Sequence, residues 1–396
     1  MKYIHRAHPS KIATISITFG AGSRVEHNSK YPEGIAHCLE HMVFKGSDKY
    51  TSKDMSKQIA LQGGSWNAFT SNDMVQYHVE MPEENIEKGI ELLSEVAFKH
   101  TFPEDEIGKE VEVICQEIRS YEDDMGSIAR KNLYSRVFDN SLSKYVIGSE
   151  KSVRSITKKD LLAFSKEFYF PAGALIVESS NTSHAHLIEK YFGITDDVLA
   201  LPPPAKEVKY APSFHYEFVK EGFKQHNIKV AFGSEKIRDL KNTHLASTDV
   251  FNYIFGGGAD ARLFMSIRED LGLVYGVYSH MSNNFDGALF GIGTSTEPEN
   301  SKKVLEAIDQ VIQDFLNNPP SDDEMTKAKN MIRSGYYSQI DSSSGSASIV
   351  VSEEILGYPS TSNYLAQIDG VSKEDVMEVA KIIFAGNKYT VIGKGE

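Results

Sequence analysis

This chain repeats its own pattern of residues about 215 positions further along, and this repeat restricts the possible folds more than any other feature. Each copy begins with proline, glutamate and asparagine, continues as an amphipathic helix, breaks at a proline and resumes after acidic residues as a second helix. The two segments read MPEENIEKGIELLSEVAFKHTFPEDEIGKEVEVICQEI and EPENSKKVLEAIDQVIQDFLNNPPSDDEMTKAKNMI. We therefore expect one α+β unit that is present twice.

Alternation of apolar and polar residues predicts strands beside these helices. Ala13, Ile15, Ile17 and Phe19 alternate with hydroxyl side chains, which predicts a half-buried strand. The first copy also predicts helices over 52–61, 84–99 and 104–121 and a strand over 75–81. The second copy predicts strands over 228–232, 273–279 and 287–295 and a helix over 243–256.

The length of 396 residues exceeds that of an ordinary single domain, so two domains are expected. A proline-rich stretch, LPPPAKEVKYAPS, separates the two copies and predicts a linker. We place the first domain at residues 1–198, the linker at 199–213 and the second domain at 214–396.

Composition and charge exclude several classes of protein. A net charge of −13 argues against a nucleic-acid partner and mildly favours neutral or basic ligands. The two cysteines, Cys38 and Cys115, make no disulfide framework, and we expect both to pack in the core. The sequence contains no recognisable signal peptide and no apolar run long enough to span a membrane, so a cytoplasmic protein without membrane contact is expected.

The segment GIAHCLEHMVF, residues 34–44, predicts a helix that carries two histidines and a glutamate on one face. His37 and His41 differ in direction by only about 40° on a helix, and Glu40 lies about 60° to the other side of His37. Two neutral imidazoles at this spacing suit Zn²⁺, and H-x-x-E-H is the inverted zincin motif. Glu40 would then take a proton from a zinc-bound water that attacks a carbonyl. By chance the pattern arises in roughly a few per cent of chains.

A catalytic zinc needs a third protein ligand, and the helix predicted over 104–121 offers two candidates. Glu110 and Glu117 are two helical turns apart and share one face, so one could bind zinc while the other orients a histidine; both could also be solvated surface acids. The second copy reads NYIFG at 252–256, where the first reads HCLEH. Because the repeat does not keep these polar groups, we interpret them as functional rather than structural.

EGIAHCLEHMVFKGS, followed by Glu117 in EVICQEIRSYEDD, resembles the M16 metallopeptidases, the family of pitrilysin, insulin-degrading enzyme and mitochondrial processing peptidase. The resemblance continues through LQGGSWNAFTSNDMVQYHV to GGGADARLFMSIREDLGLVYGVYS. It implies one zinc per chain on His37, His41 and Glu117, with Glu40 as the base and Glu110 as a supporting acid. It also implies a catalytic pair, Arg268 and Tyr275, which would stabilise negative charge on the scissile carbonyl oxygen.

The resemblance further implies the architecture and the partners. The length matches the short M16B branch, whose two α/β-roll domains, each an antiparallel sheet with helices, form half of a clamshell. An edge strand that includes Asn67, Ala68 and Phe69 would pair with an unfolded peptide, although Phe69 could equally be a core residue. Because one chain carries both the zinc motif and the Arg/Tyr pair, a homodimer with two sites is expected. The chain departs from the family in two respects: its N-terminal strand is expected to be short or absent, and residues 176–183 read IVESSNTS where relatives tend to have a glycine-containing turn after a strand.

These features together predict a zinc metallo-endopeptidase that acts on unfolded peptides enclosed in a dimeric chamber. Two alternatives remain open on the sequence. One is a non-catalytic M16-like subunit with a structural or peptide-binding role. The other is a zinc hydrolase that acts on a different carbonyl substrate.

Overall fold

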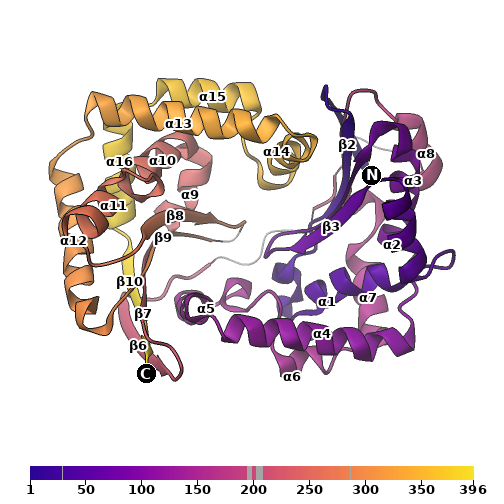
Figure 1. Ribbon diagram of the computed structural model, residues 1–396, viewed down its shortest axis with the longest axis horizontal. Coiled ribbons are helices and arrows are strands. Elements are labelled where there is room, and N and C mark those ends of the chain that lie inside the picture. Colours follow the sequence, from indigo (N-terminus) through magenta and orange to yellow (C-terminus); the bar gives the residue numbers. More distant parts are fainter. Residues whose placement is uncertain (29, 194–198, 202–207, 286) are drawn as a thin grey trace. The chain divides into compact units, whose positions relative to one another are not determined.

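The computed structural model describes residues 1–28, 30–193, 199–201, 208–285 and 287–396, so residues 202–207 of the predicted linker lie outside the described part. The chain divides into two compact units that are not contiguous in sequence (Figure 1). Unit 1 comprises Met1–Ser120, Lys144–Ala205 and Ser338–Gly357, and unit 2 comprises Tyr121–Ser143, Lys206–Tyr337 and Tyr358–Glu396. Compared with the expected ranges 1–198 and 214–396, Tyr121–Ser143 belongs to unit 2 instead of unit 1, and Ser338–Gly357 belongs to unit 1 instead of unit 2.

Unit 1 contains a five-stranded mixed sheet in the order β1-β5-β2-β4-β3. Its first strand pairs parallel with β5, and the other neighbours pair antiparallel. The strands are β1 (Lys2–Ala7), β2 (Ile12–Phe19), β3 (Ser65–Thr70), β4 (Val75–Pro82) and β5 (Ala174–Ser180). The expectation of an absent or short N-terminal strand is wrong, because β1 extends the sheet by pairing with β5 along its whole length. Its sequence, KYIHRA, lacks the alternation that marks a half-buried strand.

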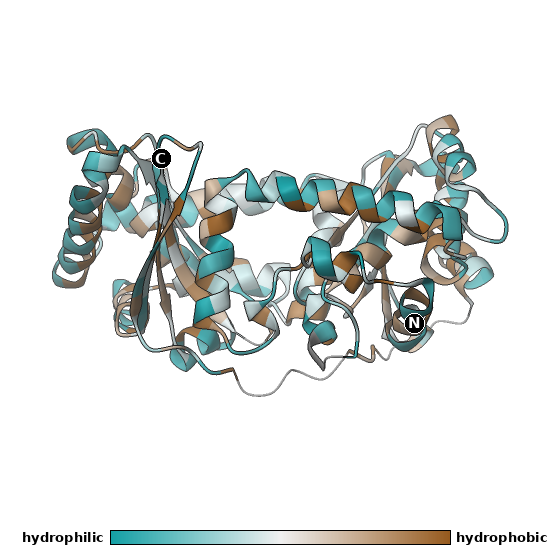
Figure 2. Ribbon diagram, turned by 90° about the horizontal axis from the view of Figure 1, so that it is seen from below, coloured by the Kyte–Doolittle hydropathy of each residue, from teal (hydrophilic) through white to brown (hydrophobic). Residues whose placement is uncertain are grey.

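The helices of unit 1 lie where the sequence predicts them over the first repeat. The amphipathic pattern places apolar residues of α3 inside, and Ile90, Leu93 and Val96 are all buried. The helices with at least eight residues are α1 (Ile35–Met42), α2 (Ser52–Leu61), α3 (Ile86–Phe98), α4 (Glu104–Glu122), α7 (Lys158–Phe168), α8 (Ala185–Phe192) and α14 (Ser343–Leu356). Figure 2 shows hydrophobic and hydrophilic residues on the same helices, as an amphipathic pattern requires.

Unit 2 repeats the topology of unit 1. Its sheet has the order β6-β10-β7-β9-β8, and its first strand again pairs parallel with its last. The strands are β6 (Phe214–Lys220), β7 (His226–Gly233), β8 (Val277–Asn283), β9 (Ala288–Thr296) and β10 (Asn387–Gly395). Renumbered from its own start, each sheet follows the same strand order, so the predicted duplication is present in the fold. The expected α+β class is confirmed, but both sheets are mixed rather than purely antiparallel.

The main helices of unit 2 are α5 (Met125–Val137), α9 (Glu235–Thr243), α10 (Leu245–Asn252), α12 (Ser301–Asn317), α13 (Asp322–Ile340), α15 (Thr361–Gly370) and α16 (Lys373–Phe384). The helix predicted over 243–256 is divided, because α10 ends at Asn252 and a π-helical segment follows over Tyr253–Gly257. The strand predicted over 273–279 begins four residues later, at Val277, since Gly272 adopts a positive φ of 62° in the preceding turn.

In each unit, a helix from the other half of the sequence packs on the sheet. Helix α14 packs on β2 and β5, and α5 packs on β7 and β10, which Figure 1 shows as contrasts of colour. The prediction that strand 13–19 is half-buried is therefore wrong, because every residue of β2 after Ile12 is buried. Its polar face meets a serine-rich face of α14, where the hydroxyl oxygens of Thr14 and Ser343 lie 2.8 Å apart.

Two further expectations concern single features. Cys38 and Cys115 are both buried and unbonded to each other, as predicted for packing residues. Among the described residues, no helix combines the length and the hydropathy that crossing a membrane requires.

Candidate metal centre

The position of α1 is set at its N-terminus by one glycine and one buried acid. Gly34 has a φ of 88°, and a Cβ there would lie 2.6 Å from the carbonyl oxygen of Ile147. The carboxylate of Glu26 accepts hydrogen bonds from the N–H groups of Gly34 at 2.9 Å and Ala36 at 2.8 Å. Burial raises the pKa of Glu26 to about 8, although both hydrogen bonds lower it. These contacts fix the start of the helix that carries both histidines.

Helix α4 brings Glu117 to the face of α1 on which the two histidines lie. The Nε2 atoms of His37 and His41 lie 3.5 Å and 3.6 Å from Oε2 of Glu117. One ligand atom from each of the three residues falls within 4.8 Å of the others, and no other His, Cys, Asp or Glu group in the described chain meets this criterion. The three donors are two imidazole nitrogens and a carboxylate oxygen, a set that suits zinc and leaves a fourth position open.

Glu110 contacts the opposite nitrogen of His41. The Nδ1 atom of His41 lies 2.8 Å from Oε1 of Glu110, while Lys45 pairs with the other carboxylate oxygen. A carboxylate at Nδ1 holds the proton there and turns the lone pair of Nε2 toward Glu117. The sequence left open which of the two glutamates would bind a metal. In the structure Glu117 lies beside both Nε2 atoms, and Glu110 lies behind one ring.

The electrostatics of the two histidines differ. Burial, with a smaller effect of His41, lowers the pKa of His37 to about 3, so His37 is neutral at neutral pH. The Nδ1 atom of His37 is buried and has no hydrogen-bond partner among the described residues, which leaves Nε2 as the nitrogen that faces the other donors. For His41, burial lowers the pKa, but the hydrogen bond that its ring donates to Glu110 and the charges of the nearby carboxylates raise it overall. The donor set therefore fits a divalent cation, whose charge would offset that of the carboxylates.

Glu40 lies beside this group and is held by the end of β3. Its carboxylate accepts a hydrogen bond from the hydroxyl of Thr70, the last residue of that strand. Burial raises the pKa of Glu40, an effect that Thr70 partly opposes. Thr70 was not among the residues predicted for the site. Its only sequence signal is that it ends the stretch SWNAFT.

Strand β3 is an edge strand, because among the described strands it pairs only with β4. Its side chains alternate, so that Trp66, Ala68 and Thr70 lie on the half-buried face and Asn67 and Phe69 on the exposed face. Phe69 is 40% exposed and is therefore not a core residue. The predicted substrate strand thus has an open edge and leads to the residue that contacts Glu40.

Arg268 and Tyr275 lie together in unit 2. The Cζ atom of Arg268 is 5.3 Å from the centre of the Tyr275 ring and 4.6 Å from that of Phe264. The Tyr275 side chain is 90% exposed, and the nearest carboxylate oxygen to Arg268, that of Glu269, is 3.6 Å from Nε. Tyr275 is thus open to solvent, and Arg268, at 38% side-chain exposure, is partly so.

Unit 2 carries no histidine at the positions that correspond to His37 and His41. Asn252 and Gly256 occupy them, and the Asn252 side-chain oxygen accepts a hydrogen bond from Ser279 at 2.7 Å. A Cβ at Gly256 would lie 2.6 Å from the Ser279 hydroxyl oxygen. Packing has thus replaced the polar cluster in the second copy.

These features define a two-unit α+β protein with one zinc-type donor set. Two sequence profiles match it: one described as Insulinase (Peptidase family M16) over residues 3–150, and one described as Peptidase M16 inactive domain over residues 155–332. The chain belongs to peptidase family M16.

Its relatives include proteins named zinc proteases. An uncharacterized zinc protease of Rickettsia felis is 28% identical over 96% of this chain and 89% of the relative. An uncharacterized zinc protease of Bacillus subtilis is 27% identical over 93% of this chain and 90% of the relative. A probable mitochondrial-processing peptidase subunit beta of Arabidopsis thaliana is 25% identical over 96% and 72%. A protease from Helicobacter pylori has the same fold in its crystal structure, with a TM-score of 0.88, 20% identity and coverage of 99% and 96%.

Proposed function

We propose that this protein is a zinc-dependent endopeptidase that hydrolyses peptide bonds in unfolded peptides. The observation that carries the proposal is the convergence of His37, His41 and Glu117 beside Glu40. The names of the relatives support zinc and proteolysis. We propose His37, His41 and Glu117 as the ligands of one zinc per chain and Glu110 as the group that orients His41.

Zinc, when bound to these ligands, supplies a Lewis acid that polarises the scissile carbonyl and makes water more acidic. Glu40 receives the proton of the attacking water and passes it to the leaving amine. Its raised pKa suits this role, because a carboxylate closer to neutrality both accepts and returns a proton. The Thr70 hydroxyl occupies one oxygen of Glu40 and leaves the other for the water.

The peptide is held by backbone pairing with the open edge of β3, next to Asn67, Ala68 and Phe69. This mode selects extended chains, because folded substrates have no free backbone to pair. Arg268 and Tyr275 donate hydrogen bonds to the carbonyl oxygen as negative charge develops there. We place the reaction in the cytoplasm and inside a homodimer that encloses the peptide and contains two sites.

Zinc content and cleavage of a quenched unfolded peptide, compared between the wild type and Glu40→Gln, test this proposal. We expect one zinc per chain in both proteins and cleavage by the wild type alone. Glu84→Gln is the matched control, because it makes the same change at an exposed position of unit 1 and should cleave normally. A zinc-loaded wild type that binds the peptide without cleaving it would indicate a non-catalytic subunit. Cleavage of esters but not peptides would indicate another class of zinc hydrolase.

The dimer has its own test in the mass measured by light scattering at micromolar concentration. The expected value is twice the 44.1 kDa of one chain. A mass of one chain would contradict the homodimer and leave the zinc site unaffected.

A further inference from the structure

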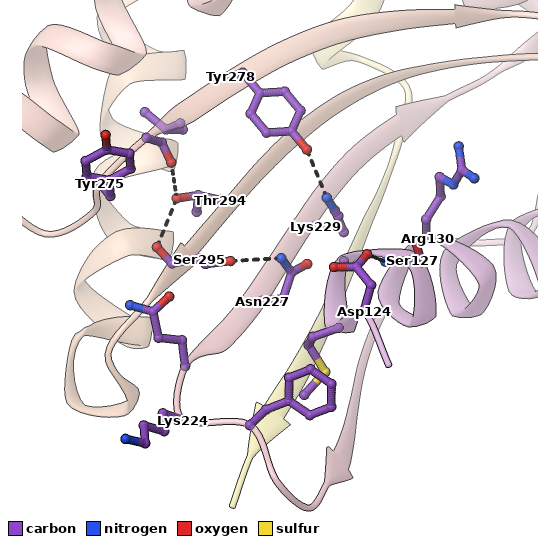
Figure 3. Close-up of a pocket in the computed structure, with 16 residues that line it drawn as sticks. Asp124, Ser127, Arg130, Lys224, Asn227, Lys229, Tyr275, Tyr278, Thr294 and Ser295 are labelled. Carbon is purple, nitrogen blue, oxygen red and sulfur yellow. Dashed lines mark hydrogen bonds between the residues drawn. The ribbon is translucent and has the colours of Figure 1, made fainter. Parts of the chain in front are cut away.

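Unit 2 contains a cavity of about 1020 Å³ beside Tyr275. It is lined by the start of α5, the turn between β6 and β7, β7 itself and the segment that leads into β8 (Figure 3). We call this cavity the Tyr275 pocket, after a lining that includes Asp124, Arg130, Lys224, Lys229, Tyr275 and Tyr278. All of its residues belong to one compact unit.

Three cations and one carboxylate line the Tyr275 pocket, in a chain whose net charge is −13. Within the described chain, none of Arg130, Lys224 and Lys229 lies within ion-pair distance of a carboxylate. The single acid, Asp124, is used to cap α5, since it accepts a hydrogen bond from the N–H of Ser127 at 2.6 Å. Asp124 also interacts with the charge of Lys229, so it offsets part of the positive charge, and three cations against one carboxylate leave the pocket lining positive.

Lys229 is built into the centre of the sheet. It lies half-buried on β7, the middle strand, and donates a hydrogen bond to the Tyr278 hydroxyl at 3.1 Å. The glycine at position 293 on β9 leaves space for this hydrogen bond. A side chain there would clash with it, because its Cβ would lie 2.8 Å from the Tyr278 oxygen and 3.1 Å from Nζ of Lys229. The neutral Tyr278 phenol leaves Lys229 without a direct ion pair, and Asp124 acts on it only through longer-range charge attraction. A ligand carboxylate at Lys229 would form such a direct ion pair.

The arrangement of the charges indicates the class of ligand. Figure 3 shows Arg130, Lys229 and Lys224 at separate places along the pocket rather than around one point. A single small anion would contact one of them, whereas an extended chain, at about 3.3 Å per residue, reaches several. Tyr275 forms part of the same lining. A peptide with its scissile carbonyl at Tyr275 would therefore place neighbouring residues in the pocket.

We infer that the Tyr275 pocket binds carboxylates of the peptide substrate within a few residues of the cleaved bond, so that acidic peptides are preferred. This inference rests on the proposed peptidase function and names the substrate class of that site. The carboxylates are supplied by aspartate and glutamate side chains or by the C-terminus of the peptide. The preference runs opposite to the one that the net charge of the whole chain suggests.

Binding tests the inference without cleavage. The protein is zinc-loaded Glu40→Gln, and the probes are fluorescent unstructured peptides that contain either glutamates or glutamines, each with a free or an amidated C-terminus. We expect the glutamate peptide to bind about fivefold more tightly at low salt, a preference that salt screens away. Arg130→Gln with Lys224→Gln should remove most of this preference and leave the Kd of the amidated glutamine peptide unchanged. Both residues are exposed, so the double variant should fold.

Lys229→Met is the second variant, and Lys303→Gln, an exposed lysine of α12, is the control. Tighter binding of the glutamate peptides with either C-terminus would show that the pocket binds side-chain carboxylates. Tighter binding of the peptides with a free C-terminus, whether they contain glutamate or glutamine, would show that it binds the terminal carboxylate. Equal Kd values for all four peptides, or a preference that survives both pocket variants, would overturn the inference. Failure of the wild type to cleave any peptide would overturn the proposed function alone, because the binding preference is measured without catalysis.

Discussion

The Nδ1 atom of His41 lies 2.8 Å from Oε1 of Glu110, on the side of the ring away from Glu117. This carboxylate fixes the orientation and the proton of the imidazole. We predict that Glu110→Gln lowers the affinity for zinc about 10–100-fold, measured by competition with a chelator. Glu112→Gln, on the exposed face of the same helix where Glu112 pairs with Arg154, should leave the affinity unchanged. Equal losses in both variants would contradict the role of Glu110.

Removal of the metal should lower the stability of the protein. Free zinc at about 100 times its Kd would stabilise the folded state by about 2.7 kcal/mol, because the ligand set forms only when α1 and α4 are folded. A chelator should therefore lower the Tm of the wild type in a scanning calorimeter, and added zinc should restore it. His37→Ala should abolish this response. His215→Ala, at an exposed histidine of β6, should keep it.

Thr70→Val should lower kcat about tenfold, because the isosteric side chain cannot donate its hydrogen bond to Glu40. Thr70→Ser should recover most of the lost activity. Zinc content and KM should stay close to the wild-type values, since Thr70 donates its hydrogen bond to Glu40 and not to one of the three proposed zinc ligands. A change in zinc affinity with an unchanged kcat would show that Thr70 acts on the fold of the site instead.

Asp249 predicts a pH dependence of stability in unit 2. Burial raises its pKa from 3.8 to about 6, although a 2.6 Å hydrogen bond from Tyr364 lowers it. A raised carboxyl pKa favours the folded state below pH 3.8, and this contribution is lost as the pH rises through about 6. The free energy of unfolding of the wild type, relative to Asp249→Asn, should fall by about 2 kcal/mol from pH 4 to pH 7 in urea titrations. Parallel profiles would contradict this.

A fragment of residues 1–198 should be deficient in stability, because it lacks the helix that covers β2 and β5. Without α14, the polar face that includes Thr14 is open and the hydrogen bond to Ser343 is lost. A synthetic peptide of residues 338–357 should raise the Tm of this fragment, whereas a scrambled peptide should not. A fragment that unfolds at the same temperature with either peptide would support the contiguous domains predicted from sequence.

Features that depend on neighbours in sequence were predictable. The duplication, most helices of each repeat and the three residues on one face of α1 follow from periodicities of 2.0 and 3.6 residues. The spacing of Glu110 and Glu117 placed both on one face of α4, but their separate contacts with His41 depend on how two helices cross. That crossing is set by tertiary packing, which the sequence pattern does not express.

Features that join distant segments were missed for the same reason. The hydroxyl residues of β2 indicated a solvent-facing side, yet the side that covers them comes from Ser343 and its neighbours, more than 300 positions later. The Tyr275 pocket combines Arg130, Lys229 and Tyr275 from three segments of the chain. Its positive charge could not be predicted from the net charge of −13, which is a sum over all residues. Only the fold brings these groups together.

The exchange of α5 and α14 also determines when each unit can be completed during synthesis. A ribosome releases residues in order, and domains generally fold as their chains emerge. The first sheet receives its last strand with β5, but one of its two faces stays uncovered until α14, which ends at Leu356, has been made. The face of the N-terminal sheet that α14 covers must therefore wait for most of the polypeptide, and the nascent chain exposes that face to chaperones throughout the interval.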